Sequence, residues 1–75
     1  MNALEKLGYK WNKDWNGNPG FRMYYNDKYI IEIFAKLNTF DKYNHDGKTV
    51  RASSAEKLAV VEVIKEMRTR NEKRV

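Results

Sequence analysis

Residues 21–35, which read FRMYYNDKYIIEIFA, decide the fold. Two runs rich in aromatic and β-branched residues, 21–25 and 29–35, flank the triplet Asn26-Asp27-Lys28. Aromatic and β-branched residues favour strands, and Asn and Asp favour turns. The stretch therefore predicts a β-hairpin.

Alternation along each run predicts which side chains share a face of the sheet. In the second run, one face carries Tyr29, Ile31, Ile33 and Ala35, and the other carries Ile30, Glu32, Phe34 and Lys36. In the first run, Phe21, Met23 and Tyr25 share a face, which we expect to point toward the core. Tyr24 and Phe34 are then expected together on the opposite face.

The segment before the hairpin predicts a short helix, a strand and a loop. Asn2 suits the N-cap of the helix, Glu5 completes a capping box, and Gly8 suits the left-handed position after its end. Residues 7–11 alternate as a strand does, with Leu7, Tyr9 and Trp11 on one side. Residues 14–20, which read DWNGNPG, combine turn-forming residues and predict a loop.

The segment after the hairpin predicts more strand and a long helix. A strand is expected over residues 39–43, a turn over 44–47, and a short edge strand over 48–51. Ser53 and Glu56 form a capping box, so a helix is expected to begin there and to run to about Arg70. Its broad apolar face, suited to packing on a sheet, comprises Leu58, Val60, Val61, Val63, Ile64 and Met67.

These elements together predict an α+β fold. We expect a small antiparallel sheet of three to five strands, with the C-terminal amphipathic helix packed on one face and a short N-terminal helix, in one domain of residues 1–75. The chain contains no cysteine, which fits a reducing cytoplasm. No run approaches the roughly 20 apolar residues of a membrane span, and the first residues do not resemble a signal peptide.

The sequence predicts a protein that is not an enzyme and binds no cofactor or metal. It has no cysteine, one histidine and no phosphate-binding or metal-ligand spacing. The one constellation with catalytic chemistry is His45 with Asp41 and Asp46. Because Asn44 and Gly47 complete a turn around it, backbone geometry explains these residues better than catalysis does.

Three features are candidate partner-binding sites. Trp15 lies in the Asn/Gly/Pro loop, where it could anchor a partner or fold back as a lid over the core. Tyr24 and Phe34 are expected on the face of the sheet away from the core. The chain carries a net charge of +5, and a basic cluster near the end comprises Arg68, Arg70, Lys73 and Arg74, partly explained by the helix dipole.

Nucleic-acid binding through the basic surface, to a single strand or a duplex, is the alternative to a protein partner. Aromatic residues between cations stack single-stranded bases in several small folds, and the cations in question are Lys10, Lys13, Arg22, Lys28, Lys36 and Lys42. Acidic residues interleave with these cations and weaken a field that would attract phosphates. Self-association through a strand edge or the helix is a third possibility.

The order of motifs resembles that of short, uncharacterised proteins of phages and prophages of Gram-positive bacteria. The resemblance rests on LEKLGY at residues 4–9, the Tyr-rich hairpin, IEI at 31–33, NTFDKY at 38–43, and EKL at 56–58 in the capped helix. It implies a small α+β protein of the bacterial cytoplasm, with no catalytic residues to transfer. The expected function is non-catalytic, stoichiometric binding to a host or phage protein.

Overall fold

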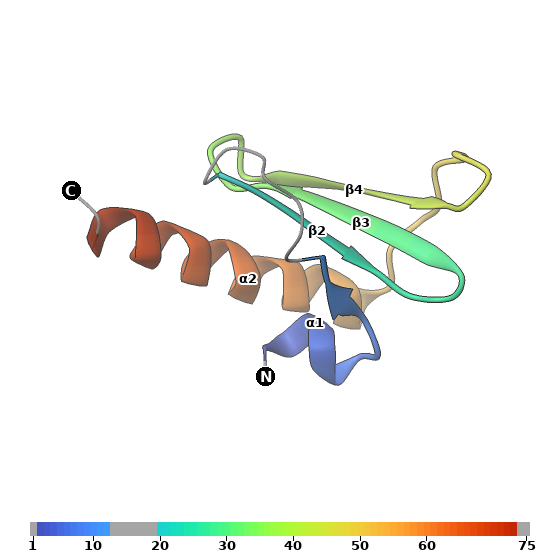
Figure 1. Ribbon diagram of the computed structural model, residues 1–75, viewed down its shortest axis with the longest axis horizontal. Coiled ribbons are helices and arrows are strands. Elements are labelled where there is room, and N and C mark those ends of the chain that lie inside the picture. The colour runs from blue at the N-terminus through green and yellow to red at the C-terminus, as the bar shows by residue number, and fades with distance from the viewer. Residues whose placement is uncertain (1, 13–19, 74–75) are drawn as a thin grey trace.

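The fold is a four-stranded antiparallel sheet with two helices on one side (Figure 1). The computed structural model describes residues 2–12 and 20–73, without the side chains of 70–73. The elements are, in order, α1 (Ala3–Lys6), β1 (Lys10–Trp11), β2 (Phe21–Tyr25), β3 (Tyr29–Phe34), β4 (Thr39–Asn44) and α2 (Ser54–Lys73). Each strand pairs with its neighbour in sequence, so the order across the sheet is β1-β2-β3-β4. The predicted α+β fold is confirmed.

Both helices begin at the predicted caps. The side chain of Asn2 accepts a hydrogen bond from the Glu5 backbone N–H, and the Glu5 carboxylate accepts one from the Asn2 N–H. The Ser53 Oγ accepts from the Glu56 N–H at 3.1 Å, and the Ser53 N–H donates to Glu56 Oε1 at 2.8 Å. Gly8, with φ of 97°, takes the left-handed conformation expected of it after α1.

The core lies between the helices and one face of the sheet, here called the inner face. Pairing places Tyr24 beside Ile31 on this face, and both side chains are fully buried. The other buried apolar residues are Leu4, Tyr9, Ile33, Ala35, Ala59, Val60, Val63, Ile64 and Met67. Trp11, Tyr29 and Phe40 pack at the margin of this cluster.

The predicted orientation of β2 is wrong. Tyr24 was expected away from the core, but it is fully buried, and Arg22 beside it in the alternation is also buried. Phe21, Met23 and Tyr25 therefore point away from the helices. The alternation along β2 is as predicted, but the opposite set of side chains faces the core. Arg22 can be buried because neighbours that only the folded chain brings together compensate its charge.

The predicted apolar face of α2 is too wide. Leu58 and Val61 were expected in it, but they are 70% and 48% exposed. The buried stripe instead includes Ala59 and the four apolar residues Val60, Val63, Ile64 and Met67. A single sheet face contacts only a narrow strip of a helix, so residues at both margins stay in solvent.

The ends of two other elements also differ from prediction. The helix α2 extends to Lys73, one turn beyond the expected end near Arg70. The expected edge strand over 48–51 is an isolated bridge between Tyr43 and Thr49, supported by the Asn44 N–H donating to the Lys48 carbonyl at 2.9 Å. In the strand expected from residue 7, only Lys10–Trp11 pair, and Leu7 is exposed.

Candidate functional site

The face of the sheet away from the helices is the candidate site, and we call it the outer face. From the strand register its residues are Lys10, Phe21, Met23, Tyr25, Ile30, Glu32, Phe34, Thr39, Asp41 and Tyr43. In the part of the chain that the structure describes, no helix packs on this face (Figure 1). Six of its ten side chains are large and apolar or aromatic, which is unusual for a sheet face without a helical layer.

The apolar side chains of the outer face contact one another across the strands. The rings of Phe21 and Phe34, on paired positions of β2 and β3, have centroids 5.2 Å apart and are tilted by 57°. Tyr25 pairs with Ile30 and is 39% exposed. Most of the others are half-buried. The result is an aromatic and aliphatic surface on β2 and β3.

Two carboxylates lie midway along β3 and the edge strand β4 on this face. Glu32 of β3 pairs directly with Asp41 of β4, so their side chains are neighbours on the same face. Neither forms a salt bridge with any cation among the described residues. Burial, together with a hydrogen bond to Glu32, raises the pKa of the Tyr43 hydroxyl. We call Glu32 and Asp41 the acidic pair.

Polar contacts on the inner face fasten α2 to the sheet. Lys42, buried in β4, donates from Nζ to Glu56 Oε1 at 2.8 Å and lies 4.0 Å from the centroid of the Tyr29 ring. The Tyr9 hydroxyl donates to Glu56 Oε2 at 2.5 Å. Glu56 thus joins the start of α2 to β4 and to the segment before β1. These groups form hydrogen bonds with one another and stabilise the packing of α2 on the sheet.

The same network shifts the titration of its members. Burial alone would raise the pKa of the Glu56 carboxyl, but hydrogen bonds from Lys42, the Ser53 backbone and Tyr9 lower it to about 2. Burial and the contact with Glu56 raise the pKa of the Tyr9 hydroxyl. The folded state therefore holds Glu56 ionised more strongly than the unfolded chain does.

Acid should weaken the fold through Glu56. Because its folded pKa lies below the usual 4.5, its stabilising contribution is complete above about pH 4.5 and is lost as the pH falls toward 2. The size of the shift corresponds to about 3 kcal/mol. Urea titrations at a series of pH values should show the difference in unfolding free energy between wild type and Glu56→Gln narrowing over this range. A constant difference would contradict the assignment.

A second inner-face network surrounds Arg22. Its guanidinium stacks on Trp11, with Cζ 3.9 Å from the ring centroid, and Nη1 donates to the Tyr24 hydroxyl at 3.1 Å. The same nitrogen lies 3.4 Å from Glu66 Oε2 of α2. Asn2 Nδ2 also donates to the Tyr24 hydroxyl, at 2.6 Å. Arg22 is thereby compensated inside the protein and is not available to a phosphate.

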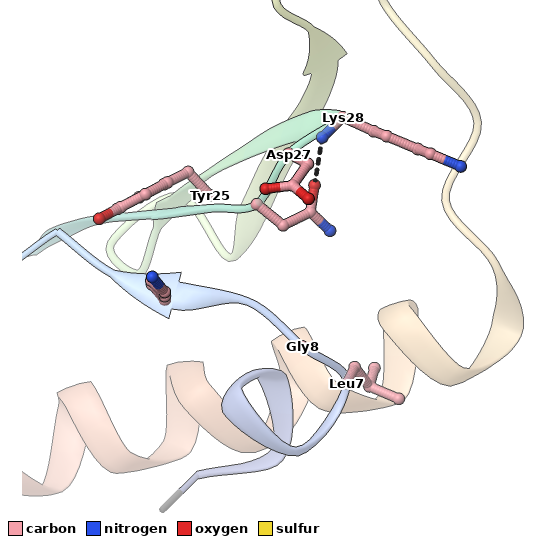
Figure 2. A pocket seen from close by; sticks show the side chains of 7 residues that line it. Leu7, Gly8, Tyr25, Asp27 and Lys28 are labelled. Atoms are coloured by element: carbon pink, nitrogen blue, oxygen red, sulfur yellow. Dashed lines mark hydrogen bonds between the residues drawn. The ribbon is translucent and has the colours of Figure 1, made fainter.

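A shallow cleft of about 350 Å³ lies at one end of the sheet, between the β2–β3 turn and the loop after α1 (Figure 2). Its lining comprises Leu7, Gly8, Lys10, Tyr25, Asn26, Asp27 and Lys28. Asn26 Oδ1 is already occupied, because it accepts from the backbone N–H groups of Lys28 and Tyr29 at 2.8 Å. Charges of both signs line the opening, so no one ligand chemistry is selected there.

The structure separates the residues predicted to bind a partner. Phe34 lies on the outer face as expected, whereas Tyr24 is in the core. Arg68 is exposed, and its Nη2 donates to the Ala35 carbonyl at 3.2 Å, so part of its guanidinium holds α2 to the end of β3. Arg70 and Lys73 lie in the last turns of α2. Trp15 and Arg74, and hence the choice between anchor and lid for Trp15, lie outside the described residues.

Sequence reasoning missed most of the site. The acidic pair, Ile30 and Tyr43 were not singled out, and Phe21, Met23 and Tyr25 were assigned to the core. One signal was present: a glutamate stands in the middle of the apolar run 29–35. A charge there indicates a strand with one face outside the core, and only the register with β4 reveals Asp41 as its neighbour.

The described residues offer little other site chemistry. They contain no group of three or more His, Asp or Glu side chains placed to hold a metal ion, and none of their helices is long and apolar enough to cross a membrane. The His45 ring donates from Nε2 to the Asn26 carbonyl at 2.9 Å, which joins two turns. Comparison with protein-family models, curated proteins and solved structures finds no match to this chain.

Proposed function

We propose that this protein is a small, non-catalytic binding module that holds a protein partner on the outer face of its sheet. The observation that carries the proposal is the apolar outer face itself, on which six large side chains stand without a helical layer among the described residues. A chain of 75 residues has little apolar area to spare from its core. Apolar surface placed outside the core in this way is typical of an interaction site.

A protein suits this face better than a nucleic acid does. The nucleic-acid alternative required aromatic rings between cations, but the central charges of the outer face are the carboxylates of Glu32 and Asp41. Two of the cations on which that alternative depended, Arg22 and Lys42, are buried and paired with Glu66 and Glu56. Carboxylates amid aromatic rings repel a phosphate backbone and admit the apolar side chains of a protein.

Among the residues that the structure describes, the lack of convergent site chemistry supports binding in place of catalysis. The buried groups Lys42 and Tyr9 both bond to Glu56, and His45 joins two turns. The resemblance to small phage and prophage proteins favours the same conclusion. We propose stoichiometric action on a host or phage protein in a bacterial cytoplasm.

Site-specific photo-cross-linking tests this function. The photoreactive residue p-benzoylphenylalanine would replace Tyr43 or Tyr25 on the outer face, or Leu58 on α2 as a control of greater exposure (70%). Because each tyrosine is replaced by another aromatic residue, the fold should persist, which circular dichroism would check. We expect irradiation of cells to give a discrete protein adduct from the outer-face positions and none from position 58.

A second change shows whether the adduct reflects specific docking. Phe34→Ser, combined with the photoreactive residue at position 43 in one protein, should remove the adduct. It disrupts the aromatic surface but leaves the cross-linking residue in place. Leu37→Ser, at a turn residue that is 74% exposed, should leave the adduct. Equal adducts from positions 43 and 58, or adducts that disappear on nuclease treatment, would exclude a protein partner on the outer face.

A further inference from the structure

We propose that the partner presents an arginine or lysine side chain, flanked by apolar side chains, to the acidic pair Glu32–Asp41. This inference rests on the proposed function and adds the chemistry of the partner. Two observations carry it: the carboxylates lie side by side midway along β3 and β4 on the outer face, and no described cation of the protein forms a salt bridge with either.

The register places the two carboxylates where one cation can reach both. Directly opposed residues of an antiparallel pair have Cβ atoms about 5 Å apart. A guanidinium between them could donate hydrogen bonds to both carboxylates from separate N–H groups, which favours arginine over lysine. The flanking positions on the same strands are Ile30, Phe34, Thr39 and Tyr43. The aromatic rings of Phe34 and Tyr43 can add favourable cation–π contact.

The pair is unfavourable to the isolated protein. Like charges that face each other across two strands destabilise a sheet. Glu32 is also half-buried and accepts a hydrogen bond from the Tyr43 hydroxyl, but no described cation neutralises its charge. By contrast, the two buried cations of the inner face, Arg22 and Lys42, each have an opposite charge within reach. A cation from a partner would relieve the repulsion between the two carboxylates. This favourable charge interaction is absent in the free protein and would stabilise the complex.

Charge also decides against the other occupants of this face. Two copies packed by their outer faces would bring two acidic pairs together in an apolar, poorly solvated interface, which is costly. A nucleic acid would bring phosphates to the same carboxylates. A basic and apolar protein segment is the occupant whose charge complements the face.

A random peptide library displayed on phage provides the probe. The library would be selected on the immobilised full chain, and the selected peptides would be titrated by fluorescence polarisation. We expect an excess of arginine or lysine with apolar neighbours. Binding should weaken by about tenfold or more with Glu32→Gln/Asp41→Asn. It should be unchanged with Asp46→Asn/Glu62→Gln, which makes the same change in net charge at exposed residues away from the face.

The variants distinguish the possible failures. Because Glu32→Gln/Asp41→Asn removes a repulsion, it should melt at or above the wild-type temperature, so lost binding is not lost folding. If the selected peptides require Phe34 but bind equally well to wild type and to Glu32→Gln/Asp41→Asn, the inference of a basic partner is overturned and the proposed function stands. Peptides indifferent to Phe34→Ser would overturn both. A dimer in analytical ultracentrifugation that Phe34→Ser dissociates would identify a second copy as the occupant and overturn the inference.

Discussion

Tyr24→Ala should destabilise the protein by about 3–5 kcal/mol, the usual cost of truncating a buried aromatic residue. Tyr24 is fully buried, and its hydroxyl accepts hydrogen bonds from Asn2 and from the buried Arg22. Removing it opens a cavity and takes a hydrogen-bond partner from a buried cation. A domain of this length has about 4–11 kcal/mol of stability, so the variant should be largely unfolded or close to it. Urea denaturation followed by circular dichroism would measure the change.

The neighbouring Tyr25→Ala is the matched control. Tyr25 is the same residue type in the same strand, but it is 39% exposed on the outer face. Its truncation should cost about 1 kcal/mol or less. The two variants together test the orientation of β2, because the opposite orientation would reverse the order of their effects. A larger loss from Tyr25→Ala would show that the inner face has been wrongly assigned.

Glu56→Ala should also cost about 3–5 kcal/mol, because it leaves the Lys42 ammonium buried without its counter-charge. It further removes the acceptor of the Tyr9 hydroxyl and half of the capping box at the start of α2. A thermal melt at neutral pH would show the loss. Replacing both members of the ion pair, as in Glu56→Gln/Lys42→Met, should restore part of the stability, since no unpaired charge then remains.

An exposed ion pair on the same helix serves as the control for Glu56→Ala. Glu62 lies 3.9 Å from Lys65, and both side chains are largely in solvent. Glu62→Ala should change the stability by less than about 1 kcal/mol. If Glu56→Ala and Glu62→Ala reduced the unfolding free energy equally, the buried position of the Glu56–Lys42 pair would add nothing to the stability.

The two faces of the sheet place their charges in contrasting ways. On the inner face, Arg22 and Lys42 each have an acidic partner from α2, so the cations help hold the layers together. On the outer face, the acidic pair has no such partner among the described residues. The inner charges are accounted for by the fold, whereas the outer charges are accounted for by a partner in our proposal.

Much of the fold could be predicted from local pattern. The capping residues Asn2 and Ser53 mark the helix starts correctly, and Gly8 takes the positive φ expected of it. The hairpin and the division of residues 29–35 into two faces are confirmed. These features depend on contacts within a few residues, which a sequence displays directly.

The candidate site was mostly invisible in the sequence. Phe34 was placed on the correct face because the residues that alternate with it, such as Ile31 and Ile33, are plainly apolar. In β2 both alternating sets contain aromatic residues, so polarity did not distinguish them, and the charge on Arg22 suggested the wrong side. The acidic pair joins residues of two strands, and its proximity depends on their register.

The sequence alone determined most of the elements of this protein, because periodicity, caps and turn residues act through neighbouring positions. Only the tertiary structure decided which side of β2 faces the core. That choice depends on whether Trp11, Tyr24 and Glu66 can surround a buried Arg22, and these groups come from β1, β2 and α2. Burying a charge is favourable only when partners compensate it, and partners that are distant in sequence meet only in the folded chain.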